Sequence, residues 1–223
     1  MPNLKMRKEW WLSIRLIHWS VVISVFTLLL TGFYIATPLV NGAGATGSKF
    51  LPGNIRTVHT FFGVLLTFLM LWRAYLGLFA KFHARWVDLL AWTDISNLVT
   101  QVKFYLLISD KKSKHDYQYG PMQSLAYSGL IILQIVIVLT GLILVGANFH
   151  AGLSLWIGGL LKPLEIAMGG LAGVRLIHHI VAWGFILFIM VHVYMAVWAD
   201  IIYKEGTISS MICGHVFRKA ESD

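Results

Sequence analysis

One stretch of the chain limits its possible folds more than any other, because it is free of charge over a length that spans a membrane. No charged side chain occurs between Arg175 and Asp200. As an α-helix rising about 1.5 Å per residue, this run is longer than the roughly 30 Å of a bilayer's hydrocarbon core. The sequence therefore predicts a transmembrane helix here.

The composition extends this prediction to the whole chain. Of its 223 residues 57% are hydrophobic and only 13% are charged, with a mean hydropathy of +0.72, whereas soluble domains carry about 25% charged residues. We expect one integral membrane domain, residues 1–223, whose surroundings are membrane lipid. The net charge of +8 does not indicate a nucleic-acid partner, because the basic residues gather in particular loops, as the positive-inside rule describes.

The cysteine content limits the redox chemistry. The chain has a single cysteine, Cys213. This excludes an internal disulfide, a Cys-x-x-Cys-His haem attachment and a four-cysteine iron–sulfur site. Any redox group in this chain must be held without thiolates.

Apolar runs and their flanking residues predict an all-α fold with four transmembrane helices, at about 10–37, 56–79, 122–146 and 174–199. Short connections on one side indicate an up-down bundle. The segment 81–119 is basic and amphipathic, which favours a position on the membrane surface. A Gly-rich connection before the last helix contains a short interfacial helix at about 153–167.

The distribution of lysine and arginine predicts the orientation. The N-terminal segment, the long loop (counting Arg73) and the tail carry 4, 7 and 3 basic residues, and the other two loops carry two each. Both termini and the long loop are therefore expected in the cytoplasm. The chain is then a multi-pass protein of a bacterial cytoplasmic (inner) membrane.

Four histidines form two pairs of equal depth in this topology. His178 and His192 are 14 residues apart on one helix, which returns them to within about 40° of one face. His18 on the first helix lies near the depth of His192 on the cytoplasmic side, and His59 on the second lies near the depth of His178 on the outer side. Imidazoles inside a membrane are expensive and usually functional. Two such pairs are what two b haems with histidine on both axial positions require, and they predict electron transfer.

Arginines accompany these histidines at helical spacing. Arg15, Arg56 and Arg175 each precede one of them by three residues, which puts both side chains on one helix face. Arg73 follows His59 by 14 residues, the spacing that also separates His178 from His192. Arg73 and His59 therefore lie near the same face of their helix. These four arginines are candidates for pairing with haem propionates; the alternative is that they meet lipid phosphates at helix ends.

Two glycines occupy similar places in the pattern. Gly32 follows His18 by 14 residues, and Gly63 lies one turn after His59. A glycine at such a position would let a flat macrocycle approach the helix backbone, although glycine is common in membrane helices.

The neighbouring histidines 178 and 179 need to be distinguished. From His192, a step of 13 residues to His179 lands about 140° away, nearly opposite. We therefore expect His178 to be the ligand and His179 to face a partner subunit or the headgroups. The remaining histidines are expected on the solvated surface: His83, His115, His150 and His215.

Several motifs carry a resemblance to a known family, and they extend from Arg15 to about Arg218. They are Ile14-Arg15-Leu16-Ile17-His18-Trp19, Thr31-Gly32-Phe33, Ile55-Arg56-x-x-His59, Thr140-Gly141-Leu142, His178 with His192-Val193-Tyr194-Met195-Ala196, Asp200-Ile201-Ile202 and Thr207-Ile208-Ser209. Together they resemble the cytochrome b subunit of membrane-bound nickel-iron uptake hydrogenases.

The resemblance implies a membrane anchor for a hydrogenase. Such a subunit takes electrons from the iron–sulfur small subunit, which sits with the large subunit on the outer side, and passes them through two b haems to a quinone. It does not itself activate hydrogen. Two alternatives stay open: the related cytochrome b of a formate dehydrogenase, and a stand-alone cytochrome b561-like oxidoreductase with a small diffusible donor. A non-redox transporter or scaffold would leave the two histidine pairs unexplained.

Overall fold

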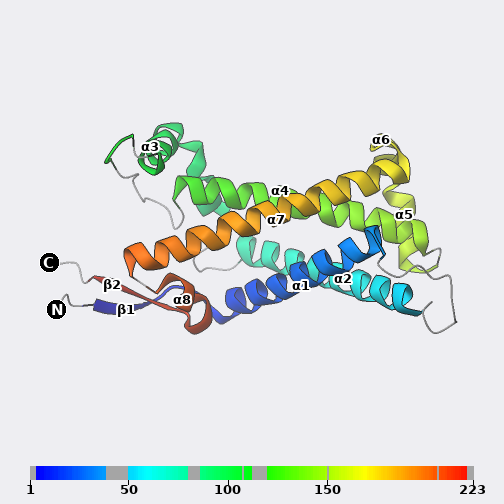
Figure 1. Ribbon diagram of the computed structural model, residues 1–223, viewed down its shortest axis with the longest axis horizontal. Helices are drawn as coiled ribbons and strands as arrows, with labels where there is room; N and C mark the ends of the chain where they lie inside the picture. The colour runs from blue at the N-terminus through cyan, green and yellow to red at the C-terminus, as the bar shows by residue number, and fades with distance from the viewer. Residues whose placement is uncertain are drawn as a thin grey trace. The chain divides into compact units, whose positions relative to one another are not determined.

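The computed structural model describes residues 4–38, 50–79, 86–106, 108–111, 120–149, 151–204 and 206–219. Its elements, in chain order, are β1 (Leu4–Lys8), α1 (Leu12–Ala36), α2 (Phe50–Phe79), the 3-10 helix η2 (Trp86–Thr93), α3 (Ile95–Tyr105), α4 (Pro121–Asn148), α5 (Leu153–Leu160), α6 (Lys162–Ala167), α7 (Gly170–Tyr203), α8 (Thr207–Cys213) and β2 (His215–Lys219) (Figure 1).

Four of these helices are long and apolar enough to cross a membrane, which confirms the predicted spans. They are α1, α2, α4 and α7. In each of these helices, only 11% to 22% of an apolar stretch of 18 residues is buried inside the protein. Since large apolar side chains such as Leu30 and Phe68 are more than half exposed, the outer faces of these helices suit a lipid solvent. The chain is a multi-pass membrane protein.

Two of the four helices begin earlier than the sequence predicts. α2 begins at Phe50 and α7 at Gly170, whereas the prediction starts both beside an arginine, at 56 and 174. Pro52 lies in the first turn of α2, where its missing N–H breaks no helical hydrogen bond. A charged residue marks where the apolar run ends, but both helices begin several residues before it.

The described contacts group the chain into two compact units. Unit 1 comprises residues 1–15, 73–134 and 185–223, and unit 2 comprises residues 16–72 and 135–184. Unit 2 contains parts of α1, α2, α4 and α7 together with α5 and α6, and its most buried residues include Leu66, Ile143 and Val174.

A glycine contact joins α4 to α5 within unit 2. A Cβ atom added to Gly146 would lie 2.7 Å from the Cα of Gly158. No other residue type allows two helix backbones to come this close, and small residues serve the same purpose at membrane helix interfaces generally. The helix expected at about 153–167 is thus present, although Leu161 divides it into α5 and α6.

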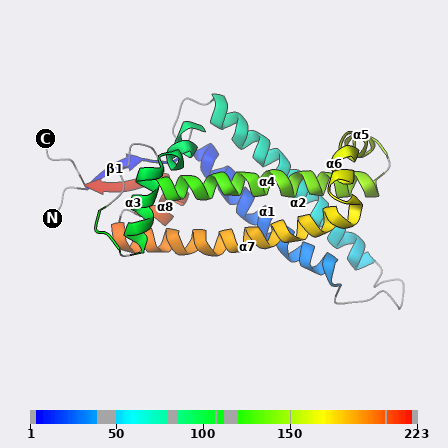
Figure 2. The ribbon, with the colours of Figure 1, turned by 90° about the horizontal axis from the view of Figure 1, so that it is seen from above.

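In unit 1 the two ends of the chain pair as a small antiparallel sheet, which the sequence analysis does not predict. β1 and β2 lie side by side (Figure 2), with Met6 opposite Phe217 and Lys8 opposite His215. The junction is Gly214, whose carbonyl accepts hydrogen bonds from the amides of Glu9 and Trp10 at 2.9 and 3.2 Å.

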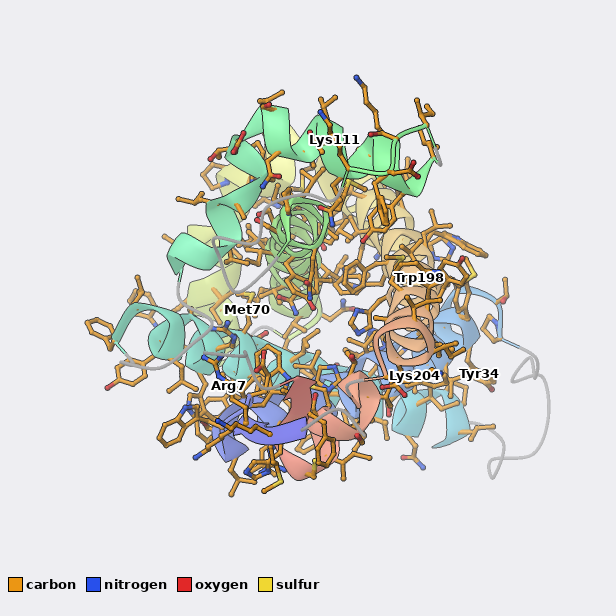
Figure 3. The ribbon with its side chains drawn as sticks, turned by 90° about the vertical axis from the view of Figure 1, so that its left-hand side faces the viewer. Arg7, Tyr34, Met70, Lys111, Trp198 and Lys204 are labelled. Atoms are coloured by element: carbon orange, nitrogen blue, oxygen red, sulfur yellow. The ribbon has the colours of Figure 1, made fainter. Side chains whose placement is uncertain are left out.

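The amphipathic segment of unit 1 contains η2 and α3. The Asp94 side chain caps α3 by accepting a hydrogen bond from the Asn97 amide at 3.1 Å. The Gln101 side chain on α3 accepts one from the Met122 amide at the start of α4. The Trp198 ring, labelled on α7 in Figure 3, lies 6.0 Å from a tyrosine ring of α3. Residues 81–85, 107 and 112–119 of this segment lie outside the described residues.

Candidate metal centre

Two predicted ligands come together inside unit 2. The ring centroids of His59 on α2 and His178 on α7 lie 6.4 Å apart, with an angle of 62° between the ring planes. A five-membered ring with bonds of about 1.35 Å places each nitrogen about 1.15 Å from its centroid. Two metal–nitrogen bonds of about 2.0 Å then require a centroid separation of about 6.3 Å. The separation of the two centroids is therefore close to the one that two imidazoles on either side of one metal ion would have.

A threonine contacts the Nδ1 atom of each histidine. Thr31 Oγ1 on α1 lies 2.8 Å from His59 Nδ1, and Thr140 Oγ1 on α4 lies 2.8 Å from His178 Nδ1. Within unit 2, the first contact thus joins α1 to α2, and the second joins α4 to α7. With Nδ1 occupied in both rings, Nε2 is the nitrogen left for a metal.

A glycine follows each threonine and makes room for the same ring. A Cβ added to Gly32 would lie 3.2 Å from His59 Cε1, and one added to Gly141 would lie 3.5 Å from His178 Cε1. The protein neighbour of Gly32 is therefore a histidine ring, and the approach of a flat macrocycle to Gly32 stays a prediction. An added Cβ at Gly63 meets nothing within 4 Å.

The donor set suits a metal that brings its own equatorial ligands. Among the residues that the structure describes, no three His, Cys, Asp or Glu side chains lie close enough to hold a metal ion. Two imidazoles alone are too few for a structural zinc site, which takes four protein ligands. Two imidazoles would be enough for a haem, whose macrocycle supplies four nitrogens of its own. The residues present therefore fit a b haem.

The other predicted ligand pair is divided between the units. His18 belongs to unit 2, where its ring meets Trp19 edge-on at 5.3 Å. His192 belongs to unit 1, where its ring stacks on Phe188 at 5.5 Å with an angle of 12°. Both side chains are half-buried on membrane helices. Their pairing stays a prediction.

The histidine beside His178 lies in different surroundings. His179 is exposed, and its ring meets Phe33 on α1 edge-on at 5.7 Å. Among the histidines expected on the surface, His215 lies in β2 with Nδ1 3.1 Å from the Cys213 carbonyl. The other three, His83, His115 and His150, lie outside the described residues.

The four candidate arginines do not share one environment. Arg15 donates from Nη1 to the carbonyl of Ile212 near the end of α8, where a cation interacts favourably with the helix dipole. Arg73 is half-buried, and Arg56 and Arg175 are exposed. A role toward propionates stays a prediction for all four, and the partner that the structure gives Arg15 is a backbone carbonyl.

The threonines are the part of this site that sequence reasoning misses. In the sequence, Thr31 and Thr140 stand out only as members of the motifs Thr31-Gly32 and Thr140-Gly141, and neither threonine has a predicted role. The available signal is the repetition itself, since a Thr-Gly pair occurs on two helices that each come before a helix carrying a candidate histidine.

Membrane-length apolar helices and a histidine pair at metal distance define a class of protein, the membrane-spanning b-type cytochromes, which hold haem between helices. The comparisons agree with this class. A family model described as prokaryotic cytochrome b561 matches residues 9–214. The chain belongs to this family, from which haem binding and electron transport follow.

Similar proteins support the assignment over nearly the full length. A probable Ni/Fe-hydrogenase B-type cytochrome subunit of Rhizobium leguminosarum bv. viciae is 28% identical over 94% of this chain and 88% of its own. Its counterpart in Azotobacter vinelandii is 30% identical, covering 90% and 84%. A probable Ni/Fe-hydrogenase 1 B-type cytochrome subunit of Escherichia coli K12 is 23% identical, covering 91% and 87%. The resemblance drawn from the motifs is thereby confirmed.

Proposed function

We propose that this chain is the di-haem cytochrome b subunit of a nickel-iron hydrogenase in a bacterial inner membrane. It carries electrons from the iron–sulfur small subunit of the hydrogenase, bound with the large subunit on the outer side, to the membrane quinone pool. The names of the similar proteins support the hydrogenase partner. The excess of basic residues in both terminal segments and in the long loop supports cytoplasmic termini.

The observation that carries the proposal is the pair formed by His59 and His178. Their separation of 6.4 Å matches two axial ligands of one iron. A b haem held there would supply one-electron redox chemistry, and with His59 and His178 as its two protein ligands its iron would have no free position for substrate. The chain's own residues would hold the group between helices. This suits a conductor of electrons rather than a site of hydrogen activation.

A second haem is proposed at His18 and His192. Their predicted depth, near the cytoplasmic side, is the support for this pair, together with their half-buried positions on membrane helices. Two stacked groups would carry electrons across the bilayer. A quinone site near the inner pair would take up protons on the cytoplasmic side and thereby add to charge separation.

The test is isolation of the native complex from membranes, followed by a pyridine haemochrome assay and a reduced-minus-oxidised spectrum under hydrogen. We expect two b haems per chain, reduced by hydrogen, with hydrogenase subunits in the same preparation. One haem or none per chain would contradict the di-haem proposal. Co-purification with a formate dehydrogenase, or purification alone with reduction by a small diffusible donor, would favour the two alternatives.

A further inference from the structure

Each ligand of the proposed outer haem is held by a two-residue unit of another helix. The Thr31-Gly32 clamp on α1 holds His59, and the Thr140-Gly141 clamp on α4 holds His178. In both clamps the threonine oxygen lies 2.8 Å from Nδ1, and the glycine leaves room for the ring carbon beside that nitrogen. The same arrangement on both axial ligands suggests a shared purpose.

The hydrogen-bond distances assign a direction to the contact between Thr31 and His59. Thr31 Oγ1 also lies 2.7 Å from the carbonyl oxygen of Thr27. Two oxygens at this distance need a proton between them, and a carbonyl has none to give. The single hydroxyl proton is therefore donated to the carbonyl. The contact between Thr31 Oγ1 and the ring then requires His59 to donate from Nδ1–H to the threonine oxygen.

The Thr140-Gly141 clamp gives the same result. Thr140 Oγ1 lies 2.7 Å from the carbonyl oxygen of Val136 and 3.1 Å from that of Ile137. Its proton is donated to the backbone, and His178 donates from Nδ1–H. A neutral imidazole with its proton on Nδ1 carries its lone pair on Nε2. Both rings are thus held in the tautomer that binds metal through Nε2.

We propose that Thr31 and Thr140 are positioning residues that fix the Nε2-ligating tautomer of His59 and His178 and lower the reduction potential of the haem between them. This inference deepens the proposed function and depends on it for the haem. A hydrogen bond from the distal N–H makes a ligating imidazole more basic, and loss of such a partner typically weakens metal affinity about 10- to 100-fold. A more basic ligand stabilises the oxidised iron, which carries the higher charge.

The experiment compares five variants with the wild type in the purified full complex. Thr31→Val and Thr140→Val remove the threonine oxygen as an acceptor while keeping the shape of the side chain. Thr31→Ser and Thr140→Ser keep the hydroxyl. Thr67→Val is the matched control, because the Thr67 hydroxyl also donates to a backbone carbonyl one turn back, that of Gly63 at 2.9 Å, but at a different place on α2.

The readouts are haem content and a spectroscopic redox titration. We expect each threonine-to-valine change at a clamp to raise the potential of one haem and leave the other haem unchanged, with haem affinity falling about 10- to 100-fold. Serine should restore the wild-type potential, and the control should match the wild type. Should a valine variant fail to assemble, Thr31→Cys and Thr140→Cys, with a weaker acceptor, should give a smaller upward shift.

Two results would overturn the inference. One is a full haem complement with unchanged reduction potentials in both Thr31→Val and Thr140→Val. The other is an equal shift in the Thr67 control, which would indicate a general effect of losing a membrane hydroxyl. A wild-type complex with one haem instead contradicts the di-haem proposal, and the potential of that haem still tests the inference. A wild-type complex without haem contradicts both.

Discussion

The ring of His178 lies 6.4 Å from that of His59, whereas the ring of the next residue, His179, is exposed against Phe33. Adjacent residues on a helix point about 100° apart, so only one of the two can face α2. We predict that His178→Ala abolishes the low-spin electron paramagnetic resonance signal of one haem, and that His179→Ala leaves both signals in place. Loss of that signal in the His179 variant alone would reverse the assignment.

The second prediction concerns Gly32. Its added Cβ would lie 3.2 Å from His59 Cε1, which is tighter than an ordinary contact, and a valine would press further into the ring. We expect Gly32→Ala to lower haem affinity modestly and Gly32→Val to lower it at least about 10-fold, measured by haem transfer to apomyoglobin. Gly129→Val on α4, where an added Cβ meets nothing within 4 Å, is the control. Equal haem retention in all three variants would show that the contact is unimportant.

The third prediction concerns the order of electron transfer. If the pair formed by His59 and His178 is nearer the electron donor, then His18→Ala should leave a haem that hydrogen still reduces, while quinone reduction fails. The measurements are the haem absorbance under hydrogen and the rate of quinone reduction in membranes. An assembled haem that hydrogen no longer reduces in this variant would show that the proposed order is wrong.

The fourth prediction concerns the junction of the chain ends. Gly214 has a positive φ of 88°, and an added Cβ would lie 3.0 Å from the carbonyl oxygen of Trp10. For an alanine the left-handed conformation alone is unfavourable by roughly 1–2 kcal/mol. Gly214→Ala should therefore speed amide hydrogen exchange in β1 about 5- to 30-fold. Gly129→Ala, at a position where an added Cβ meets nothing within 4 Å, is the control, and unchanged protection of β1 would contradict the prediction.

Local patterns in the sequence predict most of the helical structure. The four spans follow from runs of apolar residues, and helical periodicity places His178 and His179 on different faces, as the structure also has them. Each of these properties depends on residues within a few turns of one helix. The sheet of β1 and β2 is missed, although residues 4–7 alternate apolar and basic side chains, because the partner of β1 lies near the opposite end of the chain.

The sequence by itself therefore determined which segments enter the membrane and which residues could bind haem. Only the tertiary structure decided which side chains meet: that Thr31 contacts His59, that Thr140 contacts His178, and that the two rings lie at metal distance. These contacts join residues 28 or more positions apart. They depend on how far each helix is rotated and shifted against its neighbours. The packing of whole helix faces determines this rotation and shift, and no local sequence pattern predicts them.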